Sequence, residues 1–153
     1  MINKIFIASD HAGFDLKQIF IKYLPDLPWE DLGTHDLHSV DYPDFAKTLC
    51  DKLIEATGKH PATEDAFNTG VFGVLICGSG QGMAIRANKY PQIRAALCWN
   101  EDVARLSREH NNANVLCLGS RAVSSEVAEK ILKAFMAAKF EGGRHSQRVA
   151  KLC

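Results

Sequence analysis

The chain has 153 residues, which is the length of one ordinary domain with a single hydrophobic core. Lysine plus arginine and aspartate plus glutamate both number 18, so bulk charge points to neither nucleic acid nor an anionic membrane as a partner. The longest apolar runs are too short to span a bilayer, and charged residues interrupt the segment where a signal peptide needs an apolar stretch. We therefore expect a cytoplasmic protein that folds as a single domain over residues 1–153.

The cysteines and histidines further narrow the class of protein to which the chain can belong. The five cysteines are an odd number, form no C-x-x-C pair and mostly lie in apolar runs, which predicts reduced thiols in a reducing compartment. The six histidines do not fall at the spacing of zinc ligands, so we expect no structural zinc site. Neither disulfides nor structural zinc are expected to hold this fold together.

Short apolar runs alternate with amphipathic stretches from one end of the chain to the other. Runs typical of short strands buried on both faces cover 5–8, 71–77, 93–98 and 115–118, and a weaker one lies near 29–32. Helical patterns cover 16–24, 45–56, 82–89, 102–109 and 125–138. This repetition predicts a three-layer α/β/α, Rossmann-like domain built on a five-stranded parallel sheet.

Two segments depart from this rhythm. Gly58–Gly70 is polar and contains helix breakers, so it is expected to be a surface loop. In the tail 141–153, two glycines turn the chain, and Arg144 and Arg148 then follow four residues apart with His145 between them. Because residues four apart lie on one face of a helix, the tail is predicted to form an anion clamp.

Ligands bind parallel sheets at the carboxyl ends of the strands. In this chain polar or reactive residues follow the predicted strands, namely Asp10 and His11, Cys77 and Ser79, Trp99 and Asn100, and Gly119 with Ser120 and Arg121. Functional residues are expected at these positions.

The most informative segment is 74–86, where an apolar run breaks at Cys77 and passes through Gly78, Gly80 and Gly82 before a helix begins. A strand that turns into a helix points its last side chain at the helix N-terminus, where free N–H groups stabilise anions. Cys77 is therefore a candidate reactive thiolate, and the N–H groups beside it, with the Ser79 hydroxyl, are suited to hold a developing oxyanion. The alternative interpretation is a buried spectator thiol in a tight turn.

This glycine-rich loop matches none of the common phosphate loops. Its third glycine comes one residue too early for a dinucleotide fingerprint, and no Gly-Lys-Ser/Thr follows for a nucleotide P-loop. Met83 stands where the cysteine phosphatase loop has its arginine. A thiol-redox role is also disfavoured, because no resolving cysteine lies near Cys77 in the sequence.

The other polar candidates each allow two interpretations. Asp10 and His11 could bind a sugar phosphate or move a proton, or Asp10 could cap a helix beside a surface His11. His110 and Asn111 fit either a site or an ordinary helix C-terminus. Arg121 alone is typical of a solvated side chain. The remaining histidines have no partner pattern and are assigned to the surface: His35, His38 and His60.

With these residues assembled, the chain resembles the type B ribose-5-phosphate isomerases, in the wider family that includes galactose-6-phosphate isomerase subunits. The similarity runs nearly end to end and rests on motifs at 9–14, 41–43, 77–80 with 87–89, 93–95, 107–114, 119–121 and 141–148. Each motif alone is weak, but their common order and spacing are specific.

The resemblance implies interconversion of ribose 5-phosphate and ribulose 5-phosphate through an enediolate, in the non-oxidative branch of the pentose phosphate pathway and without a metal or organic cofactor. It implies that Cys77 is the proton-transferring base, that Ser79 and the N–H groups of the glycine loop hold the charged oxygens, and that His110 opens the sugar ring. Met83 stands at the place of a glutamate that some members use instead of the cysteine.

The resemblance also implies the binding residues. Asp10 and Asn111 match residues near the sugar, while the matches to phosphate ligands are His11, Arg144 and Arg148. Tyr42 and Arg121 match further lining residues.

The resemblance also bears on the assembly of the protein and on its substrate. The resemblance implies a homodimer, or dimers paired into a tetramer, whose sites combine residues of both subunits, and a sheet order that differs from the simple doubly wound one. The loop 58–70 is longer than this region usually is in such isomerases. Allose 6-phosphate and galactose 6-phosphate are alternative substrates, and a non-catalytic sugar-phosphate sensor is the alternative from a different class.

Overall fold

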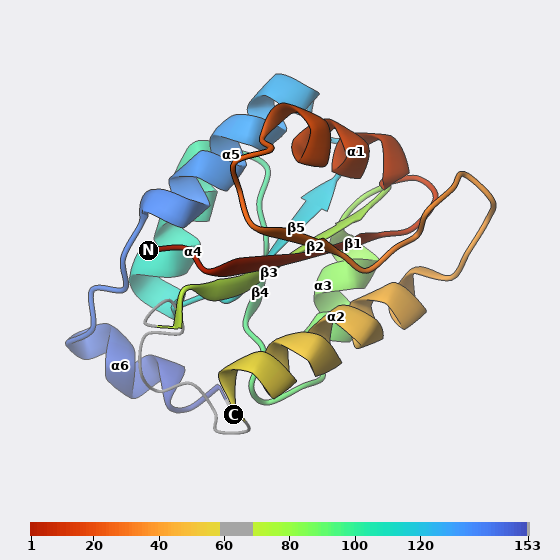
Figure 1. The fold of residues 1–153 in the computed structure, drawn as a ribbon. Coiled ribbons are helices and arrows are strands. Elements are labelled where there is room, and N and C mark those ends of the chain that lie inside the picture. Colours follow the sequence, from red (N-terminus) through yellow and green to blue (C-terminus); the bar gives the residue numbers. More distant parts are fainter. Residues whose placement is uncertain (59–68, 153) are drawn as a thin grey trace.

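The computed structural model describes residues 1–58 and 69–152, and within these residues five strands form one parallel sheet in the order β2-β1-β3-β5-β4 (Figure 1). The strands are β1 (Lys4–Ser9), β2 (Trp29–Asp31), β3 (Val71–Cys77), β4 (Ala95–Leu97) and β5 (Val115–Gly119). The predicted parallel α/β architecture is confirmed. The order also departs from the common doubly wound order 2-1-3-4-5, because β4 and β5 have exchanged places.

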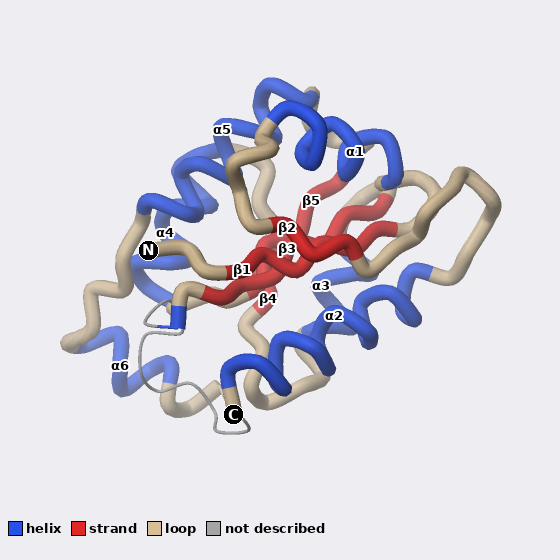
Figure 2. Tube along the Cα trace, in the orientation of Figure 1, coloured by secondary structure: helices blue, strands red, loops and turns tan. Residues whose placement is uncertain are grey.

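Helices cover both faces of the sheet (Figure 2). One face carries α1 (Phe14–Tyr23), α4 (Glu101–Asn111) and α5 (Ser125–Ala137), and the other carries α2 (Tyr42–Thr57) and α3 (Gln81–Ala87). The short α6 (Arg144–Val149) packs beside α4, on the side of the molecule where β1 and β3 begin (Figure 1). Within the tail, Arg144–Val149 is helical, so Arg144 and Arg148 lie on one face of α6, and the anion clamp stays a prediction.

The alternation of side chains along β1 divides the core into two layers. Ile5 and Ile7 pack with Phe135 on the face covered by α1, α4 and α5, while Phe6 and Ala8 pack with the residues of α2 and α3. Full burial of each larger side chain of this kind contributes roughly 1.5–3 kcal/mol to the stability of the folded state. Both faces of the central strands are therefore apolar, which explains the continuous hydrophobic runs in the sequence.

One strand differs from its prediction. The run 93–98 was expected to form a strand buried on both faces, but only Ala95–Leu97 is a strand, and its residues are half-buried. β4 lies at the edge of the sheet, where a strand pairs on one side only and is less covered. The predicted surface loop at 58–70 lies almost wholly outside the described residues.

The cysteines that the structure describes are free thiols, and all are buried. Burial raises the pKa of Cys50 to about 12 and that of Cys98 to about 11, and it raises the pKa of Cys117 as well. These thiols therefore behave as apolar core residues near neutral pH. Among the described helices, none has the length and apolar character needed to cross a membrane.

A buried lysine fixes the segment that follows β2. Lys17 is fully buried, and its Nζ donates to the Asp31 carboxylate and to the Thr34 carbonyl oxygen, the latter at 2.6 Å. Burial lowers the pKa of Lys17, and Asp31 partly offsets that effect. The backbone of the same segment pairs with Ser9 through N–H···O bonds of 2.8 Å in both directions. The carboxyl end of β1 is thereby held on its β2 side.

Close packing of the β1–α1 turn against β3 yields a stability prediction. A Cβ added at Gly13 would lie 2.4 Å from the carbonyl oxygen of Ile76, a backbone atom that cannot move without displacing β3. We expect Gly13→Ala to lower the free energy of unfolding by about 2–3 kcal/mol, measured by urea denaturation.

Gly73→Ala is the matched control, because its added methyl would meet the flexible end of the Leu49 side chain instead of backbone. The control should lose less stability than Gly13→Ala. An equal loss in both variants would contradict the role assigned to the Gly13–Ile76 contact.

Candidate active site

A cleft of about 830 Å³ opens at the carboxyl ends of the strands. The chain leaves β1 for the edge strand β2 and then returns to β3, so the ends of β1 and β3 mark the switch point where such sheets bind ligands. Eight of the residues expected in the site line this cleft: Asp10, His11, Tyr42, Cys77, Gly78, Ser79, Gly82 and Arg121.

Backbone hydrogen bonds join the strand ends beneath the cleft. The Asp10 N–H donates to the Ile76 carbonyl at 3.2 Å, which extends the β1–β3 pairing by one residue. On the other side of β3, the Ser120 N–H donates to the Cys77 carbonyl at 2.9 Å and the Arg121 N–H to the Gly78 carbonyl at 3.0 Å. The side chains that follow the three strands are therefore fixed relative to one another.

The thiol of Cys77 lies in the cleft wall and accepts a hydrogen bond. The Gly80 N–H donates to Cys77 Sγ at 3.1 Å, and Gly80 adopts the left-handed conformation with φ of 75°, which favours glycine. Only 5% of Cys77 is exposed, yet the residue borders the cleft. An N–H aimed at the sulfur is the kind of contact that a reactive thiol needs, and the reactive role of Cys77 stays a prediction.

Asp10 and His11 are held in defined orientations beside the thiol. The Asp10 carboxylate accepts a hydrogen bond from the Gly13 N–H at 3.0 Å, but Gly13 and not Asp10 is the N-cap residue of α1. His11 Nδ1 accepts from the Val40 N–H at 3.2 Å, so a neutral His11 ring carries its proton on Nε2. Nε2 is then a donor suited to an anionic ligand.

Two glycines allow large side chains to approach the loop. A Cβ on Gly78 would lie 3.1 Å from Arg121 Nη1, and a Cβ on Gly82 would lie 2.5 Å from the Tyr42 ring. The guanidinium and the phenol therefore rest directly on the loop backbone. Ser79 is exposed, and its Oγ accepts from the Gln81 N–H at 3.3 Å.

Sequence reasoning assigned no role to several residues at the cleft. Trp99 and Ile85 both border it and are 59% and 61% exposed, which is unusual for side chains of this size. Trp99 follows a predicted strand but was given no specific role. Ile85 was not singled out, because it fits the pattern of an ordinary apolar residue in a helix. Asn100 caps α4 by accepting from the Val103 N–H at 2.8 Å.

A second group of expected site residues lies away from this cleft. It consists of His110, Asn111, Arg144 and Arg148, none of which lines the cleft. His110 and Asn111 end α4, while Arg144 and Arg148 are exposed on α6. Asn111 borders a different cavity of about 500 Å³. One chain alone therefore does not assemble the whole predicted set.

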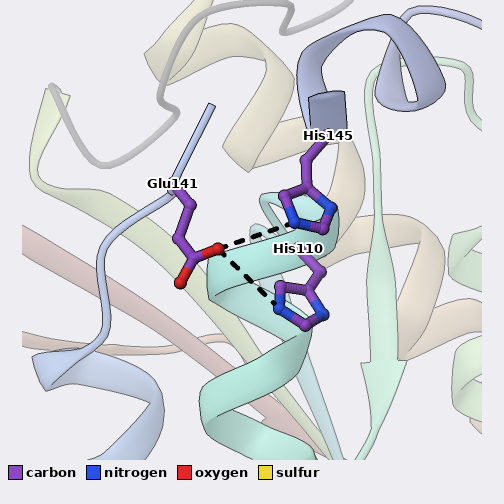
Figure 3. Close-up of side chains that lie close together, drawn as sticks. All are labelled: His110, Glu141 and His145. Carbon is purple, nitrogen blue, oxygen red and sulfur yellow. Dashed lines mark ion pairs between the residues drawn. The ribbon is translucent and has the colours of Figure 1, made fainter. Parts of the chain in front are cut away.

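Within the second group, His110 lies against the tail. The rings of His110 and His145 stack with centroids 4.3 Å apart and an angle of 6° between their planes, and both face Glu141 (Figure 3). The pKa of His145 is lowered from its ordinary value, first by desolvation and then by the positive charges of His110 and Arg144. His35 and His38 are exposed, as predicted, and His60 lies outside the described residues.

The fold and the cleft define a class: a parallel α/β protein with a thiol and an N–H-rich loop at its switch point. The family model described as Ribose/Galactose Isomerase matches residues 5–152, and the chain belongs to this family. The resemblance seen in the sequence is thereby confirmed.

Three relatives illustrate the similarity. A putative sugar phosphate isomerase of Rickettsia bellii is 44% identical, with 97% of this chain and 96% of the relative covered. The crystal structure of a ribose 5-phosphate isomerase from Thermotoga maritima has a TM-score of 0.86 and 44% identity, covering 97% of this chain and 96% of that one. Ribose-5-phosphate isomerase B from Mycoplasma genitalium, with bound ribulose-5-phosphate, has a TM-score of 0.85 and 41% identity, covering 97% and 93%.

The contrast among the thiols predicts selective alkylation. At pH 8 a thiol with a pKa of about 12, such as Cys50, is ionised in only about one molecule in ten thousand. We expect iodoacetamide to modify Cys77 at least about tenfold faster than Cys50 or Cys98, measured by mass spectrometry of the separate peptides.

The control is the same reaction in denaturing urea, where the rates of these thiols should converge. Equal labelling of Cys77 and Cys50 in the folded protein would argue that Cys77 is not a reactive thiol. Mapping by peptide keeps Cys153 apart from both.

Proposed function

We propose that this protein is an aldose–ketose isomerase that interconverts ribose 5-phosphate and ribulose 5-phosphate, with Cys77 as the acid/base. The observation that carries the proposal is the position of Cys77 Sγ in the cleft wall, where it accepts the Gly80 N–H at 3.1 Å. The family membership supports it, as do the names of relatives and the ribulose-5-phosphate bound in the Mycoplasma genitalium enzyme.

The chemistry requires a base and a site for negative charge. In the open-chain aldose, the Cys77 thiolate takes the proton from C2, and the electron pair moves to the carbonyl oxygen at C1 to give an enediolate. The thiol then returns a proton to C1, while a proton also passes between the two oxygens. Because the C2 proton is only weakly acidic, the site must stabilise the enediolate more than the sugar. Ser79 and the loop N–H groups, those of Gly78 and Gly82 included, take this role.

The remaining cleft residues bind the sugar phosphate. Asp10 lies beside the sugar hydroxyls, and His11 donates from Nε2 to the phosphate. Tyr42 and Arg121 close the loop side of the cleft. Fixing the remote phosphate holds the open chain in position for proton transfer.

A second copy of the chain completes the site. His110, Asn111, Arg144 and Arg148 do not reach the cleft of their own chain, while the cleft is bordered by the exposed side chains Trp99 and Ile85. In a homodimer, which dimer pairing could extend to a tetramer, the tail 141–153 of one subunit supplies the phosphate-binding arginines to the cleft of the other. His110 is then placed to open the sugar ring.

The proposed setting is the cytoplasm and the non-oxidative branch of the pentose phosphate pathway. Free, buried thiols among the described cysteines are what a reducing compartment maintains.

Allose 6-phosphate and galactose 6-phosphate test the substrate range, because an extra carbon needs only space in the cleft.

Removing the proposed base tests the reaction. We expect Cys77→Ala to lower kcat for ribose 5-phosphate by about 10³-fold, since a positioned base contributes a factor of this size. The assay contains a chelator and is repeated with allose 6-phosphate and galactose 6-phosphate. Cys117→Ala is the matched control, because that thiol is buried away from the cleft and should leave kcat near that of the parent.

Full turnover by folded Cys77→Ala would remove Cys77 as the base. Tight binding of sugar phosphate by the parent protein without exchange of substrate hydrogen for solvent deuterium would instead identify a sensor.

Mixing two inactive variants tests whether sites are shared. One variant is Cys77→Ala and the other is the double variant Arg144→Ala/Arg148→Ala. After subunit exchange, half of the dimers are mixed and one of their two sites has every residue intact, so about a quarter of the parent activity should return. If each chain held a whole site, the mixture would stay as inactive as its components.

A further inference from the structure

A histidine, a carboxylate and a second histidine converge outside the cleft. His110 comes from the end of α4, Glu141 from the segment before α6, and His145 from α6 itself (Figure 3). Glu141 Oε2 lies 3.5 Å from His145 Nε2 and 3.9 Å from His110 Nε2. One potential ligand atom from each residue lies within 4.8 Å of the other two.

The two distances from Glu141 approach those between the ligands of a metal centre. In a tetrahedral zinc site with bonds of about 2.0–2.1 Å, neighbouring ligand atoms are about 3.3–3.4 Å apart. The rings are nearly parallel, so their lone pairs run side by side and the rings must tilt toward each other to share an ion.

The backbone already holds the three ligands together. The Glu141 N–H donates to the Glu109 carbonyl at 3.0 Å, which ties the tail to α4 one residue before His110. The His145 N–H donates to the Gly142 carbonyl at 3.0 Å, which fixes the turn between Glu141 and His145. In the single chain Glu141 is 55% exposed, so the cluster lies at the surface of that chain.

We propose that His110, Glu141 and His145 bind Zn²⁺, with water completing the coordination, and that the bound metal inhibits the enzyme. Two imidazoles and one carboxylate form a ligand set that zinc prefers and magnesium does not. The carboxylate charge favours a cation, while the charges of Arg144 and Arg148, which also act on His145, oppose it.

Inhibition rests on the proposed function, because zinc would occupy a ring nitrogen of His110, the residue assigned to ring opening. Zinc binding itself does not depend on that function and is measured without substrate. The two parts of the proposal therefore fail separately.

Binding is tested by calorimetry on the chelator-treated full chain, with Zn²⁺ as the probe and Mg²⁺ for comparison. We expect one zinc per chain, and Glu141→Gln should weaken binding about tenfold or more. Glu109→Gln is the matched control, since its carboxylate pairs with Arg105 and no contact places it in the cluster. The control should bind zinc as the parent does.

The thiols are the competing ligands and need their own readout. Co²⁺ bound by imidazole and carboxylate lacks the intense near-ultraviolet sulfur-to-cobalt charge-transfer band that a thiolate ligand produces. A Co²⁺ complex without that band, lost in Glu141→Gln, supports the site. A thiolate band, zinc binding by Glu141→Gln that is as tight as in the parent, or no zinc binding would overturn it.

Inhibition is then measured as the ratio of kcat/KM for ribose 5-phosphate with and without zinc, each variant compared with itself. The parent and Glu109→Gln should lose activity reversibly as zinc saturates the site, and Glu141→Gln should lose it only at about tenfold higher zinc. Zinc binding at the cluster that leaves kcat/KM unchanged would refute the inhibitory role while leaving the metal site in place.

Discussion

The candidate site depends on one junction, at which the carboxyl ends of β1, β3 and β5 are joined by backbone hydrogen bonds. The Asp10 N–H reaches the Ile76 carbonyl, and the Ser120 N–H reaches the Cys77 carbonyl. Peptide groups in such pairs have little freedom, so the side chains that follow the strands share one frame. The Gly13 contact and the buried Lys17 hold the β1 side of the same junction. Positioning of this kind, and not any unusual side chain, makes the cleft suited to catalysis.

The junction also gives Cys77 surroundings that differ from those of the other buried thiols. Cys50, Cys98 and Cys117 sit among apolar groups, and burial raises their pKa values because a thiolate there loses its hydration. Cys77 is almost as buried, but it ends its strand, so the chain turns and aims the Gly80 N–H at its sulfur. The surroundings of the Cys77 sulfur are therefore set by the direction of the backbone at the end of β3. A cysteine one residue earlier in β3 would point to the opposite face of the sheet and face a helix.

Much of the fold, and the grouping of candidate residues at the cleft, could be predicted from the sequence for identifiable reasons. Strands buried on both faces leave continuous apolar runs, and residues after parallel strands share one edge, so Asp10, Cys77 and Arg121 could be grouped in advance. The predicted range for the edge strand β4 was too long, because apolar composition does not reveal whether a strand has one neighbouring strand or two. Ile85 was missed because an exposed apolar residue in a helix has the same pattern as a buried one. The convergence of His110, Glu141 and His145 depends on how α6 packs against α4, which no local pattern encodes.

The division of the candidate polar residues into two groups links the proposed dimer to the proposed zinc site. A residue that contacts a ligand in the cleft of a partner subunit must lie at the surface of its own chain. It therefore cannot be buried by hydrogen bonds and packing within that chain. On the proposed arrangement His110 therefore keeps a reachable Nε2, and Glu141 stands beside it as the carboxylate that orients the ring. An accessible imidazole next to a carboxylate is a partial zinc site, and His145 supplies the missing ligand. In the proposed dimer, the accessible ring that lets His110 act on a substrate bound to the partner subunit is also the ring that the proposed zinc site uses.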